Sequence, residues 1–282
     1  MSSPDRAFHE AWLGMVQPAE GLVVSPTVLD RAQCAERRPK AVQSQLLELC
    51  SVEKVGARVR SLAELLEQLL GLSADLFDEG AALPSSLSLY VPEGQQTLRP
   101  TRALRQEGVA AAPANDVSEG EEAPPDSTPA GRAGARYALL VWEVPAGLDL
   151  DAAETQTGPW AYPAQAKFDR LLRECRVPIG LLSNGSELRL VYAPLDSASG
   201  YLPFRVADML QSDGRPILDA FLMLLEARRW FGGRAEDRLP ALLVESRQRQ
   251  AEVTNDLSRQ VFEALEILLA GFQAAADRDG DG

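Results

Sequence analysis

The sequence predicts an α/β (α+β) protein in which a mixed β-sheet is flanked by helices and followed by a C-terminal helical segment. The first observation is the order strand, helix, strand, strand between residues 136 and 194. A strand–helix–strand crossover joins two parallel strands of one sheet, and a tight hairpin adds an antiparallel neighbour. The second observation is the helical spacing of apolar residues on both sides of this stretch, which supplies helices to cover such a sheet.

Composition limits the kinds of function. Of the 282 residues 45% are hydrophobic, which is enough for a substantial core, but no apolar run approaches the roughly 18 residues of a membrane span. The N-terminus carries acids and lacks the apolar stretch of a signal peptide. The three cysteines form no CxxC pair and predict buried, reduced thiols (Cys34, Cys50 and Cys175). We therefore expect a cytoplasmic protein without membrane contact.

The titratable residues exclude several chemistries. His9 is the only histidine and lies near a terminus that we expect to be mobile, which excludes Ser-His-Asp catalysis and HExxH zinc sites. Any reaction must then depend on carboxylates, lysine and a hard divalent cation. The net charge of −13 argues against nonspecific wrapping of DNA, and only three of the 28 basic residues are lysines.

The first part of the chain predicts helices. In an N-terminal helical segment, residues 1–40, a short amphipathic helix is expected around Trp12. A second helix is expected over 28–38, after Ser25-Pro26, a pair typical of an N-cap and a first helical position. Between residues 41 and 72 the apolar spacing is again helical and fits either one stripe or two abutting ones, with Gly56 as the candidate break.

A domain over residues 41–212 is expected to contain the sheet. Short apolar runs at 87–91 and 97–104 predict two strands around a turn, and Pro100 restricts the second one to an edge or a bulge. An insert at 107–135 is rich in acids, alanine and proline and has almost no large apolar residue. Such a composition cannot bury enough surface to fold, so we expect this insert to be disordered.

The second half of this domain carries the strongest pattern. Residues 137–144 form a near-continuous apolar run, typical of a strand covered on both faces. Residues 163–176 have apolar side chains on one face of a helix. Two further strands, 179–182 and 187–192, flank Asn184-Gly185, which is a strong hairpin signal.

The last segment, residues 213–282, predicts a helical connector. A helix is expected over 216–231 and ends at Gly232-Gly233. Apolar residues then recur every three or four positions from 239 to 276, which predicts one long helix or two.

These elements resemble the PD-(D/E)XK nuclease core in the N-terminal domains of type I restriction subunits and type IIG-like restriction–modification polypeptides. There, a strand ending in ExK precedes a helix bearing a glutamine, and a strand, a TNG turn and a strand follow. Here Gln165-Ala166-Lys167-Phe168 begins the helix, and GLLSNGSELRLVYAP matches the strands and the turn. LLVESRQRQAEVTNDLSRQVFEALEILLAGFQ resembles the helical connector before an N6-adenine methyltransferase domain, and DISARM-type phage-defence methyltransferases carry similar N-terminal regions. The resemblance covers residues 136–275 and, less closely, 40–105, and it implies a restriction-endonuclease-like mixed sheet.

The residues that cut DNA in this family are missing here. The position of the metal-binding aspartate corresponds to Thr101, and that of the lysine corresponds to Pro145. In the family, two carboxylates hold a divalent ion that polarises the phosphate and activates water, and the lysine assists. With Glu143 as the remaining carboxylate, we expect weak metal binding and a degenerate, non-cleaving core, and we predict no metal site.

Three residues are candidate remnants of the catalytic site. Glu143 is either a surviving metal ligand or a strand-end carboxylate in solvent or paired with an arginine. Lys167 either replaces the missing lysine or is an ordinary helix-surface lysine, and Gln165 either aids catalysis or forms hydrogen bonds at the helix start. Three acids of the intervening loop either form a metal-binding loop or are solvated, and we expect them to be solvated (Asp149, Asp151 and Glu154).

Two sets of arginines are candidates for DNA contact. One set follows the predicted strand around Pro100, and the other lies along the helix over 163–176. Each set either meets phosphates or forms a solvated face. In the helix set, offsets of three residues spread the side chains around the helix instead of aligning them in one stripe. The six residues are Arg99, Arg102, Arg105, Arg170, Arg173 and Arg176.

The sequence leaves three functions open, and with them the question of whether the chain is an enzyme. It has no [NDS]PP[YFW] motif, no GxGxxG loop and no P-loop. S-adenosylmethionine would therefore belong to a downstream domain or a partner. The resemblance implies a non-cleaving module of a bacterial restriction–modification or phage-defence DNA methyltransferase system, which docks DNA, a methyltransferase domain or other restriction or defence subunits. The alternatives are an active Mg²⁺-dependent endonuclease with a relocated lysine, and a protein–protein adaptor that does not contact nucleic acid.

Overall fold

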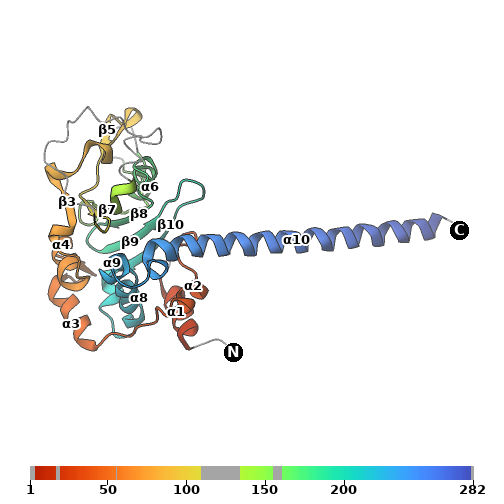
Figure 1. Ribbon diagram of the computed structural model, residues 1–282, viewed down its shortest axis with the longest axis horizontal. Helices are drawn as coiled ribbons and strands as arrows, with labels where there is room; N and C mark the ends of the chain where they lie inside the picture. The colour runs from red at the N-terminus through yellow and green to blue at the C-terminus, as the bar shows by residue number, and fades with distance from the viewer. Residues whose placement is uncertain (1–3, 17–19, 55, 109–133, 155–160, 281–282) are drawn as a thin grey trace.

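A computed structural model describes residues 4–16, 20–54, 56–108, 134–154 and 161–280. It confirms the predicted fold class, because a six-stranded mixed sheet is flanked by helices and followed by a C-terminal helical segment (Figure 1). Most of the insert predicted at 107–135 lies outside the described residues. None of the described helices combines the length and the hydropathy that crossing a membrane would require.

The sheet has the strand order β10-β9-β8-β7-β6-β3. β7 and β8 are parallel and the other neighbours are antiparallel. Helix α6 (Ala164–Glu174) forms the crossover from β7 to β8, and the predicted turn at Asn184-Gly185 joins β8 to β9. The strands are β3 (Phe77–Glu79), β6 (Arg102–Arg105), β7 (Tyr137–Glu143), β8 (Ile179–Ser183), β9 (Glu187–Tyr192) and β10 (Gly200–Arg205).

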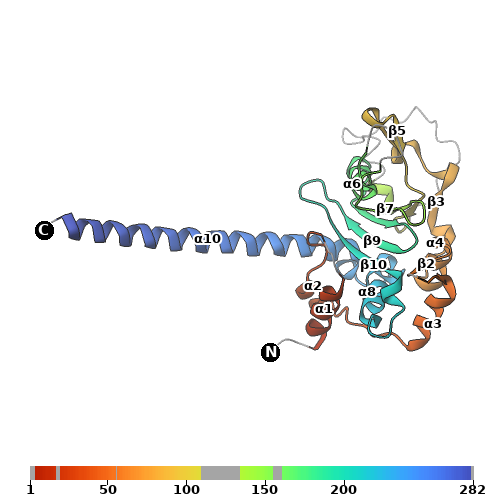
Figure 2. The ribbon, with the colours of Figure 1, turned by 180° about the vertical axis from the view of Figure 1, so that it is seen from behind.

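Alternation along the strands divides the core into two layers. Leu140 and Leu182 pack with α6 on one face of the sheet, whereas Val141 and Leu181 belong to a larger cluster on the other face. That larger cluster takes residues from each of the three predicted segments of the chain. The helices that contribute to it include α1 (Pro4–Met15), α2 (Pro26–Arg31), α3 (Lys40–Leu49), α7 (Val206–Met209), α8 (Arg215–Leu225) and α9 (Arg228–Phe231), several of which are labelled in Figure 2.

Of the two predicted arrangements over 41–72, the structure contradicts the single helical stripe and has a break around Gly56, but the break is a β-hairpin that was not predicted. α3 ends at Leu49, and the hairpin of β1 (Cys50–Val52) and β2 (Ala57–Val59) follows. The N–H of Val59 donates to the carbonyl of Gly185 at 2.8 Å, so a tertiary contact overrides the local helical pattern. The chain returns to helix in α4 (Leu62–Glu64) and in the wider turns of η1 (Leu65–Leu69).

The strand predicted over 97–104 is interrupted at Pro100. Its first part, β5 (Gln96–Leu98), pairs with β4 (Leu89–Val91) in a separate hairpin, and its second part is β6 of the main sheet. Two outer strands, β3 and β10, were not predicted. Short 3₁₀ turns complete the chain: η2 (Ala74–Leu76), η3 (Gly80–Ala82), η4 (Ser85–Leu87), η5 (Pro92–Gly94) and η6 (Ala235–Asp237).

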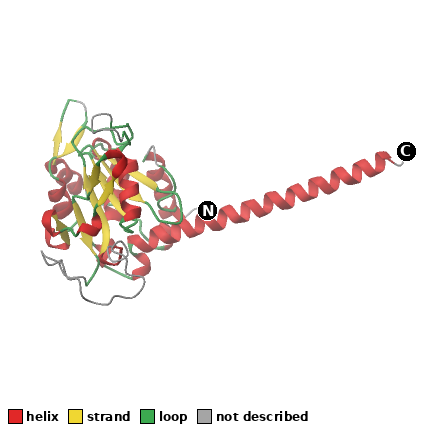
Figure 3. Ribbon diagram, turned by 90° about the horizontal axis from the view of Figure 1, so that it is seen from above, coloured by secondary structure: helices red, strands yellow, loops and turns green. Residues whose placement is uncertain are grey.

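The predicted helix over 28–38 is shorter in the structure, since α2 ends at Arg31. The predicted helix over 216–231 is split into α8 and α9, because Glu226 has the extended ψ angle of 150°. The last helix, α10 (Leu239–Gly280), is a single element. Its first turns pack on the body through Leu242 and Leu243, and the remainder projects away from it (Figure 3).

The terminus around His9 is not a mobile segment. His9 is fully buried in α1, and the indole Nε1 of Trp12 donates to His9 Nδ1 at 3.2 Å. Burial lowers the pKa of His9. The prediction for the three cysteines is confirmed as to burial, since all are free and buried, and burial raises the pKa of Cys175 to about 12.

Candidate functional site

The remnant carboxylate Glu143 lies at the end of β7 and is held by an arginine of β6. Arg102 donates from Nη1 to Glu143 Oε1 at 2.6 Å and from Nε to Glu79 Oε2 at 2.9 Å. The N–H of Glu143 donates to the hydroxyl of Thr101 at 2.9 Å. The structure thus brings together Thr101 and Glu143, but the ionic partner of the carboxylate is a guanidinium from its own sheet.

Lys167 lies on the other side of the sheet from Glu143. The rings of Trp142 and Phe168 are 5.7 Å apart, so Trp142 faces α6. Successive side chains of a strand point to opposite faces, and Glu143 therefore points away from α6. Lys167 is fully buried and donates to Glu154 at 2.9 Å. The expectation of an ordinary surface lysine is wrong, and Lys167 and Glu143 do not form one site.

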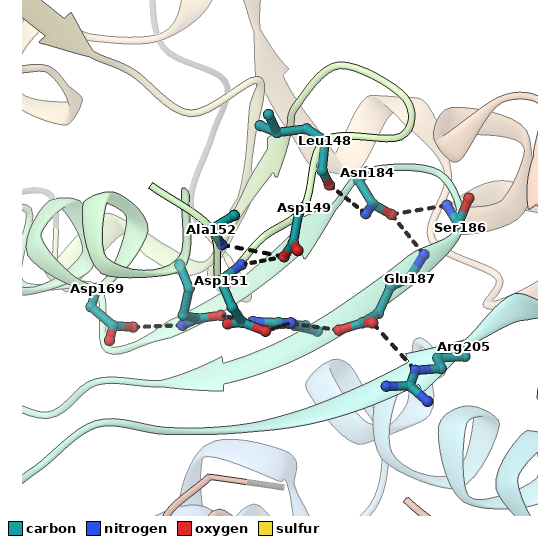
Figure 4. A network of polar contacts seen from close by, with 11 residues as sticks. Leu148, Asp149, Asp151, Ala152, Asp169, Asn184, Ser186, Glu187 and Arg205 are labelled. Atoms are coloured by element: carbon teal, nitrogen blue, oxygen red, sulfur yellow. Dashed lines mark hydrogen bonds and ion pairs between the residues drawn. The ribbon is translucent and has the colours of Figure 1, made fainter. Parts of the chain in front are cut away.

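A second charged cluster surrounds Arg189 of β9, which is only 4% exposed. Two of its acidic members, Asp151 and Glu187, are labelled in Figure 4. Its guanidinium forms two hydrogen bonds with the carboxylate of Asp151, at 2.7 and 2.6 Å, and one with Glu187 at 2.5 Å. It also donates to the side-chain oxygen of Gln165 at 3.3 Å and lies 4.3 Å from the ring centroid of Tyr201. We call these five residues the Arg189 cluster.

In the Arg189 cluster, the cost of burying the guanidinium is opposed by its interactions with two carboxylates. Burial alone would lower the pKa of Arg189, but the hydrogen bonds to Asp151 and Glu187 outweigh it, so its pKa is raised. The same hydrogen bond from Arg189 lowers the pKa of Asp151. Because every charge has an opposite partner, the cluster leaves no buried charge unpaired and offers no carboxylate that is ready to bind a cation.

Gln165 joins the Arg189 cluster to a buried aspartate. Its amide donates to Asp169 at 2.9 Å, and the hydroxyl of Ser199 donates to the same carboxylate at 2.7 Å. Burial raises the pKa of Asp169 against these hydrogen bonds. Gln165 therefore has the role of a hydrogen-bonding residue at the helix start, which was one of its two predicted roles.

The loop after β7 is fixed to the hairpin turn. Asn184 donates to the carbonyl of Leu148 at 2.8 Å, and its side-chain oxygen accepts from the N–H groups of Ser186 and Glu187 at 3.0 and 2.8 Å (Figure 4). Of the three loop acids that we expect to be solvated, Asp149 and Asp151 are exposed, although Asp149 accepts from the N–H of Asp151 and Asp151 pairs with Arg189. The expectation is wrong for Glu154, whose side chain is only 10% exposed and pairs with Lys167.

Sequence reasoning missed four charged residues that the fold buries: Asp78, Arg189, Asp219 and Arg229. Arg189 has been described above, and Asp78 of β3 is 2% exposed. Asp78 accepts from Arg105 at 2.5 Å and from the hydroxyl of Tyr137 at 2.6 Å. The available signal was a charged side chain between apolar neighbours in a short strand, as in Glu187 to Tyr192.

The six candidate arginines are mostly bound within the fold. Arg99 donates to the carbonyls of Gly80 and Leu83, and Arg173 donates to that of Ser197 at 2.9 Å. Arg102 and Arg105 are paired with acids, as described above. Arg170 is half-buried and Arg176 is exposed. At least four of the six guanidinium groups therefore have structural contacts that a DNA phosphate would have to compete with.

Two hollows flank the base of α10. The larger, about 580 Å³, lies between α10 and the segment after β9, and we call it the α10 groove. Its lining includes Tyr192, Pro194, Val244, Arg247 and Ala251. The smaller hollow, about 380 Å³, lies toward the start of α2.

The carboxylates at the end of β7 do not fit the divalent ion of the resembled family. Arg102 supplies the positive charge beside Glu143, and Thr101 offers a hydroxyl where a second carboxylate would be needed. Across the described ranges, no group of three or more His, Cys, Asp or Glu side chains is arranged to hold a metal ion. Comparisons of the chain with protein-family models, with curated proteins and with solved structures gave no match.

Proposed function

We propose that this chain is a non-cleaving, nuclease-like module of a bacterial, cytoplasmic restriction–modification or phage-defence DNA methyltransferase system, and that it docks a partner subunit or domain. The observation that carries this proposal is the ion pair of 2.6 Å between Arg102 and Glu143. It lies at the strand end where the resemblance requires a metal-binding carboxylate.

The ion pair opposes metal-dependent cleavage for an electrostatic reason. A divalent ion at Glu143 would have to displace a guanidinium that already neutralises the carboxylate, and it would lie close to that positive charge. Only one carboxylate would remain to hold it, whereas hard cations take several oxygen ligands. The burial of Lys167 on the opposite face argues against the alternative in which this lysine takes part in cleavage.

Docking of a protein partner is better supported than docking of DNA. The net charge of −13 repels a polyanion, and four of the six candidate arginines are held by carbonyls or acids of the fold. The α10 groove and the projecting helix offer a surface that suits a protein. The partner that the resemblance implies is a methyltransferase domain or another subunit of the same system.

The first experiment tests cleavage. Purified chain is incubated with supercoiled plasmid and Mg²⁺ or Mn²⁺, beside the matched variants Glu143→Gln and Lys167→Met. We expect the plasmid to remain intact with all three proteins. Cleavage that disappears in Glu143→Gln would contradict the inactive core, and cleavage that disappears in Lys167→Met would establish the relocated lysine.

The second experiment separates the two kinds of docking. Fluorescence anisotropy is measured with labelled duplex DNA at low and high salt, and, in parallel, with a methyltransferase encoded beside this chain. We expect association with the methyltransferase and no DNA binding even at low salt, where phosphate contacts are strongest. DNA binding that weakens steeply with salt, and that Arg170→Gln and Arg176→Gln reduce, would assign the module to DNA instead.

A further inference from the structure

The outer part of α10 exposes an unusual amount of apolar surface. Seven large apolar residues between positions 257 and 269 are each 48–73% exposed. A single helix in water gains nothing from such residues, and helices in proteins are stabilised mainly by packing of an apolar face. These residues are Leu257, Val261, Phe262, Leu265, Ile267, Leu268 and Leu269.

Six of the seven residues share one side of the helix. With about 100° between successive residues, all except Ile267 lie within an arc of roughly 140°. The charged side chains lie outside this arc: Glu252, Asp256, Arg259, Glu263 and Glu266. A stripe of this width is typical of a helix packed against another helix, and it is wider than the narrowest coiled-coil seam.

We propose that a second copy of this chain covers this face, and that the two α10 helices pair antiparallel about a two-fold axis. In the register that we infer, Phe262 of each helix packs against Leu265 of the other copy. A two-fold axis makes each contact occur twice, so a favourable pair is doubled.

Charge and apolar complementarity support this register. When Phe262 and Leu265 are taken as core positions of a heptad, Arg259 and Glu266 are flanking positions on one side, and Val261 and Leu268 are flanking positions on the other. The antiparallel arrangement then places Arg259 opposite Glu266 of the second copy, twice, and Val261 opposite Leu268, twice. A parallel pair would instead place Val261 beside Glu266 and would form neither ion pair.

Two apolar residues lie on the same side of α10 nearer the body of the molecule. Val244, which is 46% exposed, and Ala251 line the α10 groove together with Tyr192 and Pro194, and the polar residues Arg247 and Thr254 lie between and beyond them on this side. In the inferred register, position 276 of the second copy passes Ala251, at the mouth of this groove.

The first experiment measures self-association of the full chain by sedimentation velocity over a concentration series. We expect a reversible dimer. Leu265→Glu should raise the dimer dissociation constant at least roughly tenfold, because two apolar contacts are lost per dimer. The matched control is Ile267→Glu, which adds the same charge two residues away on the opposite side and should leave the constant unchanged. A chain that stays monomeric at every concentration, as docking to a different protein alone would give, contradicts the proposal.

The second experiment tests the register by exchanging charges. Arg259→Glu and Glu266→Arg should each weaken the dimer, because each creates two like-charge pairs, and the double variant R259E/E266R should restore it. Circular dichroism of all variants checks that the helix is retained. A dimer that Leu265→Glu does not weaken, or one that the double variant does not restore, would show that the chain associates through another surface or in another register.

Discussion

The guanidinium of Arg102 lies 2.6 Å from the carboxylate of Glu143, across two neighbouring strands of the main sheet. The Arg102 side chain is 17% exposed and the Glu143 side chain 34% exposed, so both partners are partly desolvated. The charge that a bound cation would supply at this strand end is thus supplied by the protein itself. The same contact that joins the two strands is thus the one on which the proposed absence of cleavage depends.

We expect a measurable coupling between these two residues. In a double-mutant cycle of Arg102→Met and Glu143→Gln, the coupling free energy should be about 1 kcal/mol, as for a partly exposed ion pair of good geometry. Urea unfolding at low and high salt measures it, and the coupling should decrease with salt. Strictly additive effects at low salt would mean that the pair contributes nothing in solution.

In the Arg189 cluster, substitution of the arginine should lower the free energy of unfolding by more than substitutions of Arg102 or Glu143. Arg189→Met leaves Glu187 and Asp151 without their shared cation and should lower the free energy of unfolding by about 3–5 kcal/mol. Asp151→Asn keeps a hydrogen-bond acceptor and should cost about 1 kcal/mol, because Arg189 retains Glu187 and Gln165. Chemical denaturation compares the two variants. Equal losses in both would contradict the central role of the guanidinium.

The hairpin turn allows a graded test at Asn184. Asn184→Ala removes three hydrogen bonds and should cost about 2–3 kcal/mol. Asn184→Asp keeps both acceptor contacts, loses only the donation to Leu148 and should cost about 1 kcal/mol. Ser186→Ala, at an exposed position of the same turn, is the control and should be nearly neutral. Thermal unfolding of the three variants should reproduce this order.

Gly180 should not tolerate a side chain. A Cβ at this position would clash with the ring of Phe168 and with Leu172, both on α6. Gly180→Ala should therefore destabilise the protein by about 1–3 kcal/mol through overpacking. Gly14→Ala in α1 meets no atom within 4 Å and should instead stabilise by about 0.5–1 kcal/mol. Similar effects of the two changes would argue against close packing of α6 on β8.

His9 predicts a pH dependence of stability. Burial lowers its folded-state pKa, and the charge of Arg229 lowers it further, whereas the charges of Asp5 and Asp30 raise it. The unfolded chain therefore binds the proton more readily, and the His9 contribution should be lost as the pH falls below about 6.5. His9→Gln keeps an acceptor for Trp12 and should flatten this part of the profile. Unchanged slopes between about pH 7 and pH 5 in urea titrations would contradict it.

The sequence predicted those parts of the fold whose signals are local. β7, α6, β8 and β9 have strong periodicity and a turn that matches, and their residues occupy the expected positions. The hairpin at 50–59 could not be predicted, because it depends on the contact between Val59 and Gly185. β3 has only three residues, two of them acidic, and is defined by its pairing with β6.

The site was less predictable than the fold. Arg189 and Asp151 are 38 residues apart in the sequence, and only the path of the loop after β7 brings them together. The opposite orientation of Glu143 and Lys167 depends on strand alternation at the exact end of β7, where a shift of one residue would exchange the two faces. The pairing of Glu143 with an arginine was among the predicted alternatives, but the identity of Arg102 as its partner required the register of β6 and β7.

The length of α10 as one continuous helix has a consequence for distance. The helix leaves the body near residue 248, and the portion that follows is about 50 Å long at 1.5 Å per residue. It therefore acts as a spacer, and whatever binds its far end is held at a fixed separation and at a fixed rotation about the helix axis. Insertion of seven residues would lengthen this spacer by about 10 Å while nearly preserving the rotation, whereas insertion of two would turn the far end by roughly 200°.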